Sequence, residues 1–319
     1  MARILVVGLL LLVLLVGLAV GYFFFSFPDV GPAPAIRVDA TPERLARGAY
    51  LANHVTLCTD CHAHRDWGQF AGPIVPGTEG AGGERFDEAM GFPGDIHAPN
   101  ITPAALDGWT DGEIIRAVAS GVSRDGTALF PVMPYPSYRL MTEEDMYSIT
   151  AYLRTLPSVE HSVPERRLHF PVNLLVRTMP AEWTPSEPIS PNDRLAYGRY
   201  LATIAECAFC HTPMEGGRRV EGMDLAGGFE FQMPSGLVRS PNLTPDVETG
   251  IGSWTEEAFI ARFKIYDGPD GQRMTAEEAG FNTPMPWIQY AGMTEEDLGA
   301  IFTYLRSLKP IRNRVITVE

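Results

Sequence analysis

The first feature of the hydropathy pattern is a long apolar run at the amino terminus. No charged residue occurs between Ile4 and Phe27, and a helix rising ~1.5 Å per residue would span roughly 36 Å there. That length covers a hydrocarbon core of about 30 Å, whereas the apolar core of a cleaved signal peptide usually has about 7–15 residues. The pattern predicts a transmembrane anchor over residues 1–27, with a cleaved signal as the alternative. Arg3 favours a cytoplasmic N-terminus, so the rest of the chain is expected outside.

Beyond a Pro-rich spacer over residues 28–37, apolar positions recur at helical spacing. Thr41, followed by a proline, predicts the start of a first helix. Thr142, followed by three acidic residues, predicts the start of a last one. Between them, residues 68–94 are too rich in glycine and proline for regular structure, and we expect a loop there. Residues 38–157 are therefore predicted to form a first helical domain.

The second half of the chain repeats the first at an offset of about 150 residues, which indicates domain duplication. The segment from Met293 to Asp297 repeats the segment from Met141 to Asp145 letter for letter. Ser190, followed by a proline, is the predicted N-cap of the first helix of the repeat. The resulting boundaries are a connector over residues 158–189, a second domain over residues 190–310 and a C-terminal tail over residues 311–319.

Each half carries one Cys-x-x-Cys-His motif, and the two motifs use all four cysteines of the chain. This spacing is the attachment signature of c-type haem, in which two thiols bind the porphyrin edge and the adjacent histidine binds iron. A bare Cys-x-x-Cys would also be compatible with a zinc or dithiol site. The histidine that follows in both copies favours two covalent haems, on Cys58, Cys61 and His62 and on Cys207, Cys210 and His211.

The opposite face of each haem iron needs a second ligand or stays open. Met133 and Met285 recur at equivalent positions in Pro-flanked turns outside any predicted helix. A proline on the following residue keeps the methionine backbone extended, which suits a ligand arm across a haem face. Met141 and Met293 also recur, but each precedes a threonine N-cap and is expected to pack on its own helix. We therefore predict Met133 and Met285 as axial ligands, with core packing as the alternative.

The histidines outside the motifs have no counterpart in the other half, so each is expected to be a surface or hydrogen-bonded residue. Only His64 and His97 are placed to compete as ligands of the first haem. The remaining repeated residues have predicted structural roles: local hydrogen bonds in a turn for Asn100 and Asn242, and a close crossing of the first and last helices for Gly48 and Gly198.

The formal net charge of −14 excludes the electrostatic footprint of a nucleic-acid-binding protein. An acidic surface fits a neutral or basic protein partner, such as a basic soluble electron carrier, although it also serves plain solubility.

Several of the repeated segments together resemble the membrane-bound multihaem cytochrome c subunits of periplasmic quinoprotein and flavoprotein dehydrogenases, such as alcohol and gluconate dehydrogenase. The resemblance covers both halves after residue 40. It is carried by the haem motifs, the Asn-x-Thr-Pro segments at Asn100 and Asn242, Trp109 and Trp254, the Met-Pro turns and the Met-Thr-Glu-Glu-Asp helix starts.

This resemblance implies an all-α fold of two tandem class I cytochrome c domains plus one N-terminal transmembrane helix. Cys58, Cys61, His62 and Met133 would serve one haem, and Cys207, Cys210, His211 and Met285 the other. The related subunits commonly carry three haems and many anchor at the C-terminus. This chain departs from them with two motifs and an N-terminal apolar run.

The implied function is electron transfer without a catalytic residue. Electrons would pass from a membrane-associated dehydrogenase or quinol-oxidising partner to a periplasmic or terminal acceptor, and an oxidase or a reaction centre would also fit as a partner. The haem domains would lie on the periplasmic side of a bacterial inner membrane. The alternatives are a dihaem redox enzyme of the peroxidase or thiosulfate-oxidising kind, and a docking subunit whose haems are incidental.

Overall fold

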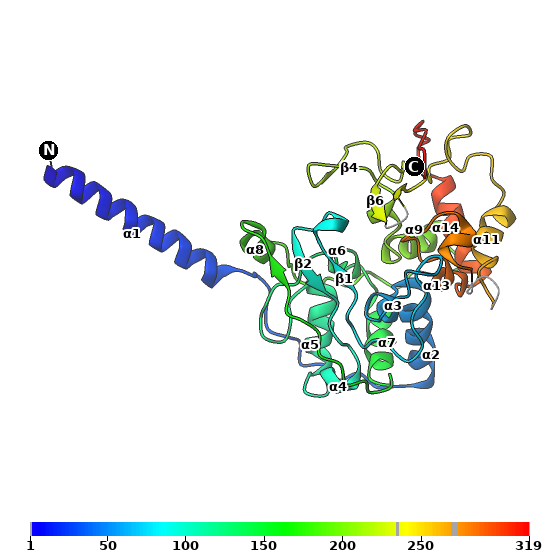
Figure 1. The fold of residues 1–319 in the computed structure, drawn as a ribbon. Coiled ribbons are helices and arrows are strands. Elements are labelled where there is room, and N and C mark those ends of the chain that lie inside the picture. The colour runs from blue at the N-terminus through cyan, green and yellow to red at the C-terminus, as the bar shows by residue number, and fades with distance from the viewer. Residues whose placement is uncertain (1, 234–235, 269–273, 319) are drawn as a thin grey trace.

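A computed structural model describes residues 2–233, 236–268 and 274–318. Met1 of the predicted anchor and Glu319 of the predicted tail therefore lie outside the described residues. Helix α1 (Ala2–Ser26) extends away from a body that contains all the other elements (Figure 1). Its side chains are largely exposed, and among the described residues it is the one helix long and apolar enough to cross a membrane.

The first half of the body is built from short helices that begin where the polar pattern predicts. Thr41 caps the first of them, and Thr142 caps the last by accepting a hydrogen bond from the Asp145 amide. In chain order the helices are α2 (Pro42–Tyr50), η1 (Leu51–Val55), α3 (Cys58–Cys61), η2 (Glu88–Met90), α4 (Pro103–Leu106), α5 (Asp111–Ile115), η3 (Arg116–Ser120), α6 (Tyr135–Tyr138) and α7 (Glu143–Leu153).

The second half follows the same order of elements. Its first helix begins at Arg194 with Asp193 as N-cap, so the prediction that Ser190 caps it is wrong. The Ser190 hydroxyl accepts a hydrogen bond from the Asn192 amide instead, in a local turn that competes with the helix. The helices are α9 (Arg194–Ile204), α10 (Cys207–Cys210), α11 (Glu256–Lys264), α12 (Ala276–Ala279), α13 (Trp287–Ala291) and α14 (Glu295–Arg306).

In each half the first and last helices cross closely, α2 on α7 and α9 on α14. A Cβ on Gly48 would lie 2.0 Å from the carbonyl oxygen of Ser148, and a Cβ on Gly198 would lie 1.8 Å from that of Ala300. Backbone touches backbone at both crossings, so only glycine fits. The predicted role of these two glycines is confirmed.

The structure is helix-rich, but short strands accompany the helices. β1 (Arg85–Phe86) and η2 lie inside the stretch predicted as a loop, so that prediction is wrong in part. Most of its positive-φ glycines lie in the turns before β1, and Gly91 lies in the turn between β1 and β2. One sheet has the order β1, β2 (Gly94–His97), β3 (Arg167–Leu168), all antiparallel. The other strands form two hairpins, β4 (Met214–Glu215) with β5 (Arg218–Arg219) and β6 (Glu230–Met233) with β7 (Gly236–Arg239).

The connector between the halves follows the surface of the first half. Its strand β3 pairs with β2, and it continues into α8 (Val172–Leu175) and η4 (Val176–Thr178), which lie beside the end of α1 nearest the body (Figure 1). One large hydrophobic cluster contains buried side chains of both halves. The two halves are therefore packed together and not merely tethered.

Candidate functional site

Both Cys-x-x-Cys-His motifs are positioned by the same backbone device. The residue before the first cysteine is Leu57 in one half and Glu206 in the other, with φ of 56° and 57°. Left-handed φ is costly for residues other than glycine and persists only where the surroundings impose it. This residue lets the chain reverse directly into the short helix that carries the two cysteines. That helix is α3, after η1, in the first half and α10, after α9, in the second. The same strained position in both halves indicates two copies of one site.

The histidine of each motif is buried and oriented by a backbone carbonyl. His62 Nδ1 lies 2.6 Å from the Pro99 carbonyl oxygen, and His211 Nδ1 lies 2.9 Å from that of Pro241. Because a carbonyl only accepts, Nδ1 carries the proton and Nε2 keeps a free lone pair. Burial lowers the pKa of both imidazoles, which favours the neutral form that binds metal.

One glycine in each half, which the sequence reasoning missed, packs against the carbonyl of the proline that orients the histidine. The Gly82 amide donates to the His62 carbonyl at 2.9 Å, and the Gly227 amide donates to the His211 carbonyl at 2.8 Å. A Cβ on either glycine would lie 2.5 Å from the carbonyl carbon of Pro99 or Pro241. The signal was present as Ala-Gly-Gly, which occurs at residues 81–83 and again at residues 226–228.

Asn100 and Asn242 fix the turn that follows these prolines. In each case the side-chain oxygen accepts from both the amide and the hydroxyl of the threonine two residues on, at 2.8–2.9 Å. The side-chain NH₂ donates at 2.8 Å to the carbonyl of Val159 or Ile311, beyond the last helix of each half. The predicted turn-organising role of the two asparagines is confirmed.

The two Pro-flanked methionines are tied to the cysteine motifs through the helix that follows each of them. Met133 and Met285 are partly buried against the hydrophobic cluster. On the helix after Met133, the Tyr138 hydroxyl donates at 2.6 Å to the carbonyl of Thr56, two residues before Cys58. The Tyr290 hydroxyl makes the equivalent 2.6 Å bond to Ala205. Each Met turn is thereby held to the haem motif of its own half.

The other repeated methionines behave as predicted for core residues. Met141 and Met293 are 0% and 1% exposed, and each directly precedes a threonine N-cap. Their helical partners Met146 and Leu298 are fully buried in the same cluster. Their recurrence therefore has a packing explanation, which does not extend to Met133 and Met285.

The histidines outside the motifs have contacts elsewhere. The His64 ring packs against that of His161 with centroids 4.8 Å apart, and His97 Nε2 lies 3.9 Å from Asp95. His54 Nδ1 lies 2.9 Å from the Gln289 carbonyl oxygen, a contact between the halves.

The zinc and dithiol alternatives find no support in the geometry. Across the part of the chain that the structure describes, no three His, Cys, Asp or Glu side chains gather in a group that would hold a metal ion. Burial raises the pKa of the Cys58 thiol, the reverse of the low pKa typical of reactive redox cysteines. A motif that presents two thiols beside an oriented imidazole is instead the chemistry that c-type haem requires.

A buried carboxylate distinguishes the first site from the second. Asp60, between the two cysteines, is 1% exposed and accepts a 2.6 Å hydrogen bond from Gln289 Nε2 of the second half. Arg65 lies 3.4 Å from its other oxygen. The equivalent residue in the second motif is Phe209. The two Cys-x-x-Cys-His motifs therefore have different electrostatic surroundings, which the motif sequence alone does not predict.

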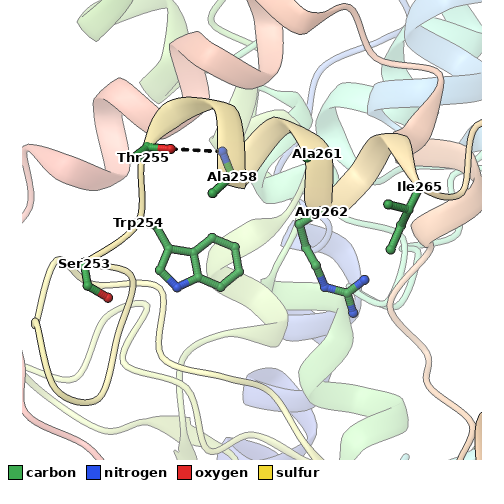
Figure 2. Close-up of a pocket in the computed structure, with 7 residues that line it drawn as sticks. All are labelled: Ser253, Trp254, Thr255, Ala258, Ala261, Arg262 and Ile265. Atoms are coloured by element: carbon green, nitrogen blue, oxygen red, sulfur yellow. Dashed lines mark hydrogen bonds between the residues drawn. The ribbon is translucent and has the colours of Figure 1, made fainter.

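A hollow of about 430 Å³ on the outer face of α11 is separate from both motifs. Figure 2 shows it between Trp254 and Ile265, with the helix backbone as its floor. Arg262, also on its wall, lies 4.2 Å over the ring of Trp287. None of its lining residues belongs to a motif.

The family model of cytochrome c matches residues 195–309, so this part of the chain is a cytochrome c domain, which implies covalently bound haem c.

Curated relatives extend the similarity over most of the chain. The chain is 30% identical to the cytochrome c subunit of the quinone-dependent alcohol dehydrogenase of Gluconacetobacter polyoxogenes, over 88% of this chain and 59% of the relative. It is 31% identical to the fructose dehydrogenase cytochrome subunit of Gluconobacter japonicus, over 87% of this chain and 54% of the relative. It is also 29% identical to a dihaem c-type cytochrome of Cereibacter sphaeroides, over 80% of this chain and 82% of the relative.

The chain spans somewhat more than half the length of the two dehydrogenase subunits. The expected resemblance to multihaem cytochrome c subunits of dehydrogenases is confirmed. The expectation of an electron-transfer subunit, not a catalytic one, agrees with these descriptions.

Proposed function

We propose that this chain is a membrane-anchored dihaem cytochrome c that relays single electrons. The observation that carries the proposal is the duplicated site, in which the motif, the left-handed residue, the histidine–carbonyl bond and the tethered Met turn recur. The two haem domains would be residues 38–157 and 190–310, joined by the connector over residues 158–189.

Each haem would be bound by its two cysteines and ligated by histidine and methionine. His62 and Met133 would ligate one iron, and His211 and Met285 the other. The haem supplies a one-electron couple, and a methionine ligand raises its potential. The chain's own residues orient the imidazole, exclude water by burial and fill the sixth position. A closed iron leaves no place for a substrate, which favours a relay over a peroxidase-like or thiosulfate-oxidising enzyme.

Helix α1 would anchor the relay in a bacterial inner membrane with the haem domains on the periplasmic side. Its length and composition support this, although a signal sequence passes the same test. The descriptions of the relatives support a dehydrogenase as electron donor, and the proposed anchor would place that donor at the membrane. The net charge of −14 supports a basic soluble carrier as acceptor, because opposite charge accelerates encounter. A quinol-oxidising complex, an oxidase or a reaction centre fits the same chemistry as a partner.

The intact mass of the polypeptide isolated from its native membrane tests both parts of this proposal. The expected result is a chain that retains residues 4–27 and carries two covalent haems. A mature N-terminus near Ile36 would reject the anchor and leave a soluble periplasmic cytochrome. A mass with one haem, or with none, would reject the dihaem relay.

A further inference from the structure

The connector exposes a small apolar patch, formed by Phe170, Leu175 and Met179. These side chains are 78%, 54% and 48% exposed, although they lie within ten residues of one another. Val176, in the same segment, is 2% exposed and fixes it to the body. Single exposed apolar residues are common on a protein surface, but a group of large ones on and directly beside one short helical segment indicates a contact surface.

The patch is held beside the end of α1 by direct contacts. The Arg177 guanidinium donates to the carbonyl oxygen of Phe24 at 3.2 Å and also to that of Phe27, and it lies 5.3 Å over the Phe24 ring. Further along, the Glu182 carboxylate accepts a hydrogen bond from the Gly31 amide. Figure 1 shows α8 next to the point where α1 enters the body. The position of the patch is thus fixed relative to the proposed anchor.

The length of α1 determines the depth of this point in a bilayer. Its 25 residues rise about 37 Å, against a hydrocarbon core of about 30 Å. The last turn, where Arg177 binds, would then lie at the boundary between headgroups and acyl chains. A side chain with a charged tip and apolar stem is suited to that level.

We infer that Phe170, Leu175 and Met179 insert into the lipid of the outer leaflet beside the anchor. Segments of this kind lie in the interface plane with their apolar side chains in the acyl boundary. This second contact would stop the first half from rotating about α1 and would hold its haem site at a fixed height above the membrane. The inference rests on the proposed anchor and concerns a segment to which the haem chemistry assigns no role.

Site-specific photocross-linking of the full haem-loaded chain in nanodiscs tests it. The photoreactive residue p-benzoylphenylalanine is placed in turn at Phe170, at Leu175, at Val247 and at Leu14. Val247 is a matched control, because it is 69% exposed and apolar but lies in the second half, away from α1. Leu14 reports on the anchor itself. Mass spectrometry then quantifies the phospholipid adduct at each position.

We expect several-fold more lipid adduct at Phe170 and Leu175 than at Val247, and strong adduct at Leu14. Adduct at Leu14 with none above the Val247 level at Phe170 and Leu175 would overturn the patch while leaving the anchor intact. No adduct at Leu14 would overturn the anchor, and the patch inference with it. In native membranes, cross-links from Phe170 and Leu175 to a polypeptide in place of lipid would assign the patch to a partner subunit and also overturn the inference.

Discussion

The Tyr50 hydroxyl donates a 2.7 Å hydrogen bond to the carboxylate of Asp297, a residue 247 positions later in the chain. The equivalent tyrosine of the second half, Tyr200, donates to Asp145 of the first at 2.6 Å. Each tyrosine oxygen also accepts from the amide of the N-cap threonine beside its partner, Thr294 or Thr142. The two halves therefore hold each other through one reciprocal contact. This contact helps to fix the separation of the two Cys-x-x-Cys-His motifs.

Removing the Tyr50 hydroxyl should destabilise the fold more than removing the Tyr200 hydroxyl. Asp145 keeps a bidentate partner in Arg47, at 2.8 and 3.0 Å. Among the described residues, the Asp297 carboxylate has a long 3.5 Å contact from Tyr197 besides its bond from Tyr50. Tyr50→Phe should therefore lower the free energy of unfolding by about 2 kcal/mol and Tyr200→Phe by about 1 kcal/mol.

Denaturant unfolding of the haem-loaded chain in detergent measures these differences. Tyr304→Phe is the control, because its hydroxyl has no hydrogen bond among the contacts of the described residues. Equal stability of the Tyr50→Phe and Tyr304→Phe variants would show that the reciprocal contact contributes nothing.

The helix crossing in the second half should not tolerate a methyl group. Gly198→Ala places a Cβ against the backbone of Ala300, which cannot move without separating α9 from α14. We expect a loss of about 3 kcal/mol or more. Gly299→Ala, on the same pair of helices, meets only the flexible ends of Arg194 and Glu256 and should change stability by less than about 1 kcal/mol. Denaturant unfolding of the Gly198→Ala and Gly299→Ala variants measures this difference. Similar midpoints for the two variants would contradict the close crossing of α9 and α14.

Glu206 should make stability depend on pH near neutrality. Burial raises its pKa from 4.5 to about 7, and its Oε1 is buried without a hydrogen-bond partner among the described atoms. The folded chain thus keeps this proton to a higher pH than the unfolded chain does. The free energy of unfolding should then fall as pH rises from about 4.5 to about 7 and stay lower above that.

Glu206→Gln should remove that fall and gain stability relative to the native chain at pH 8. Glu221→Gln, at an exposed position, is the control and should leave the profile unchanged. An identical pH profile for the Glu206→Gln variant and the native chain would show that burial does not raise the pKa of the Glu206 carboxyl.

The parts of this structure that follow from the sequence are local or repeated. The threonine caps at Thr41 and Thr142 depend on neighbouring residues alone, so a pattern of a few positions predicts them. Gly48, Gly198 and the buried Met293 were predicted because the second half of the chain served as a comparison for the first. The axial roles of the Pro-flanked methionines stay predictions.

The parts that could not be predicted depend on contacts between distant segments. Nothing near Asp60 in the chain indicates that Gln289 will satisfy its carboxylate, since the partner comes from the other half. The pairing of β3 with β2 and the contact of Arg177 with α1 likewise arise only when the connector folds back on the body. Gly82 was missed for a different reason. It lies in a glycine-rich stretch, and such a stretch indicates a loop without showing which of its glycines the backbone packing requires.

Met133 and Met285 are expected to close both irons, and the relay function depends on this closure. The direct test is the near-infrared Met-to-iron charge-transfer band and the spin state of the oxidised chain. Met285→Ala and Met133→Ala should each remove part of the band, produce one high-spin haem and lower that haem's potential. Met293→Ala, a fully buried core position, should cost about 2–5 kcal/mol of stability and leave the spectrum unchanged. If Met293→Ala abolished the band while Met285→Ala left it intact, the ligand assignment would be wrong.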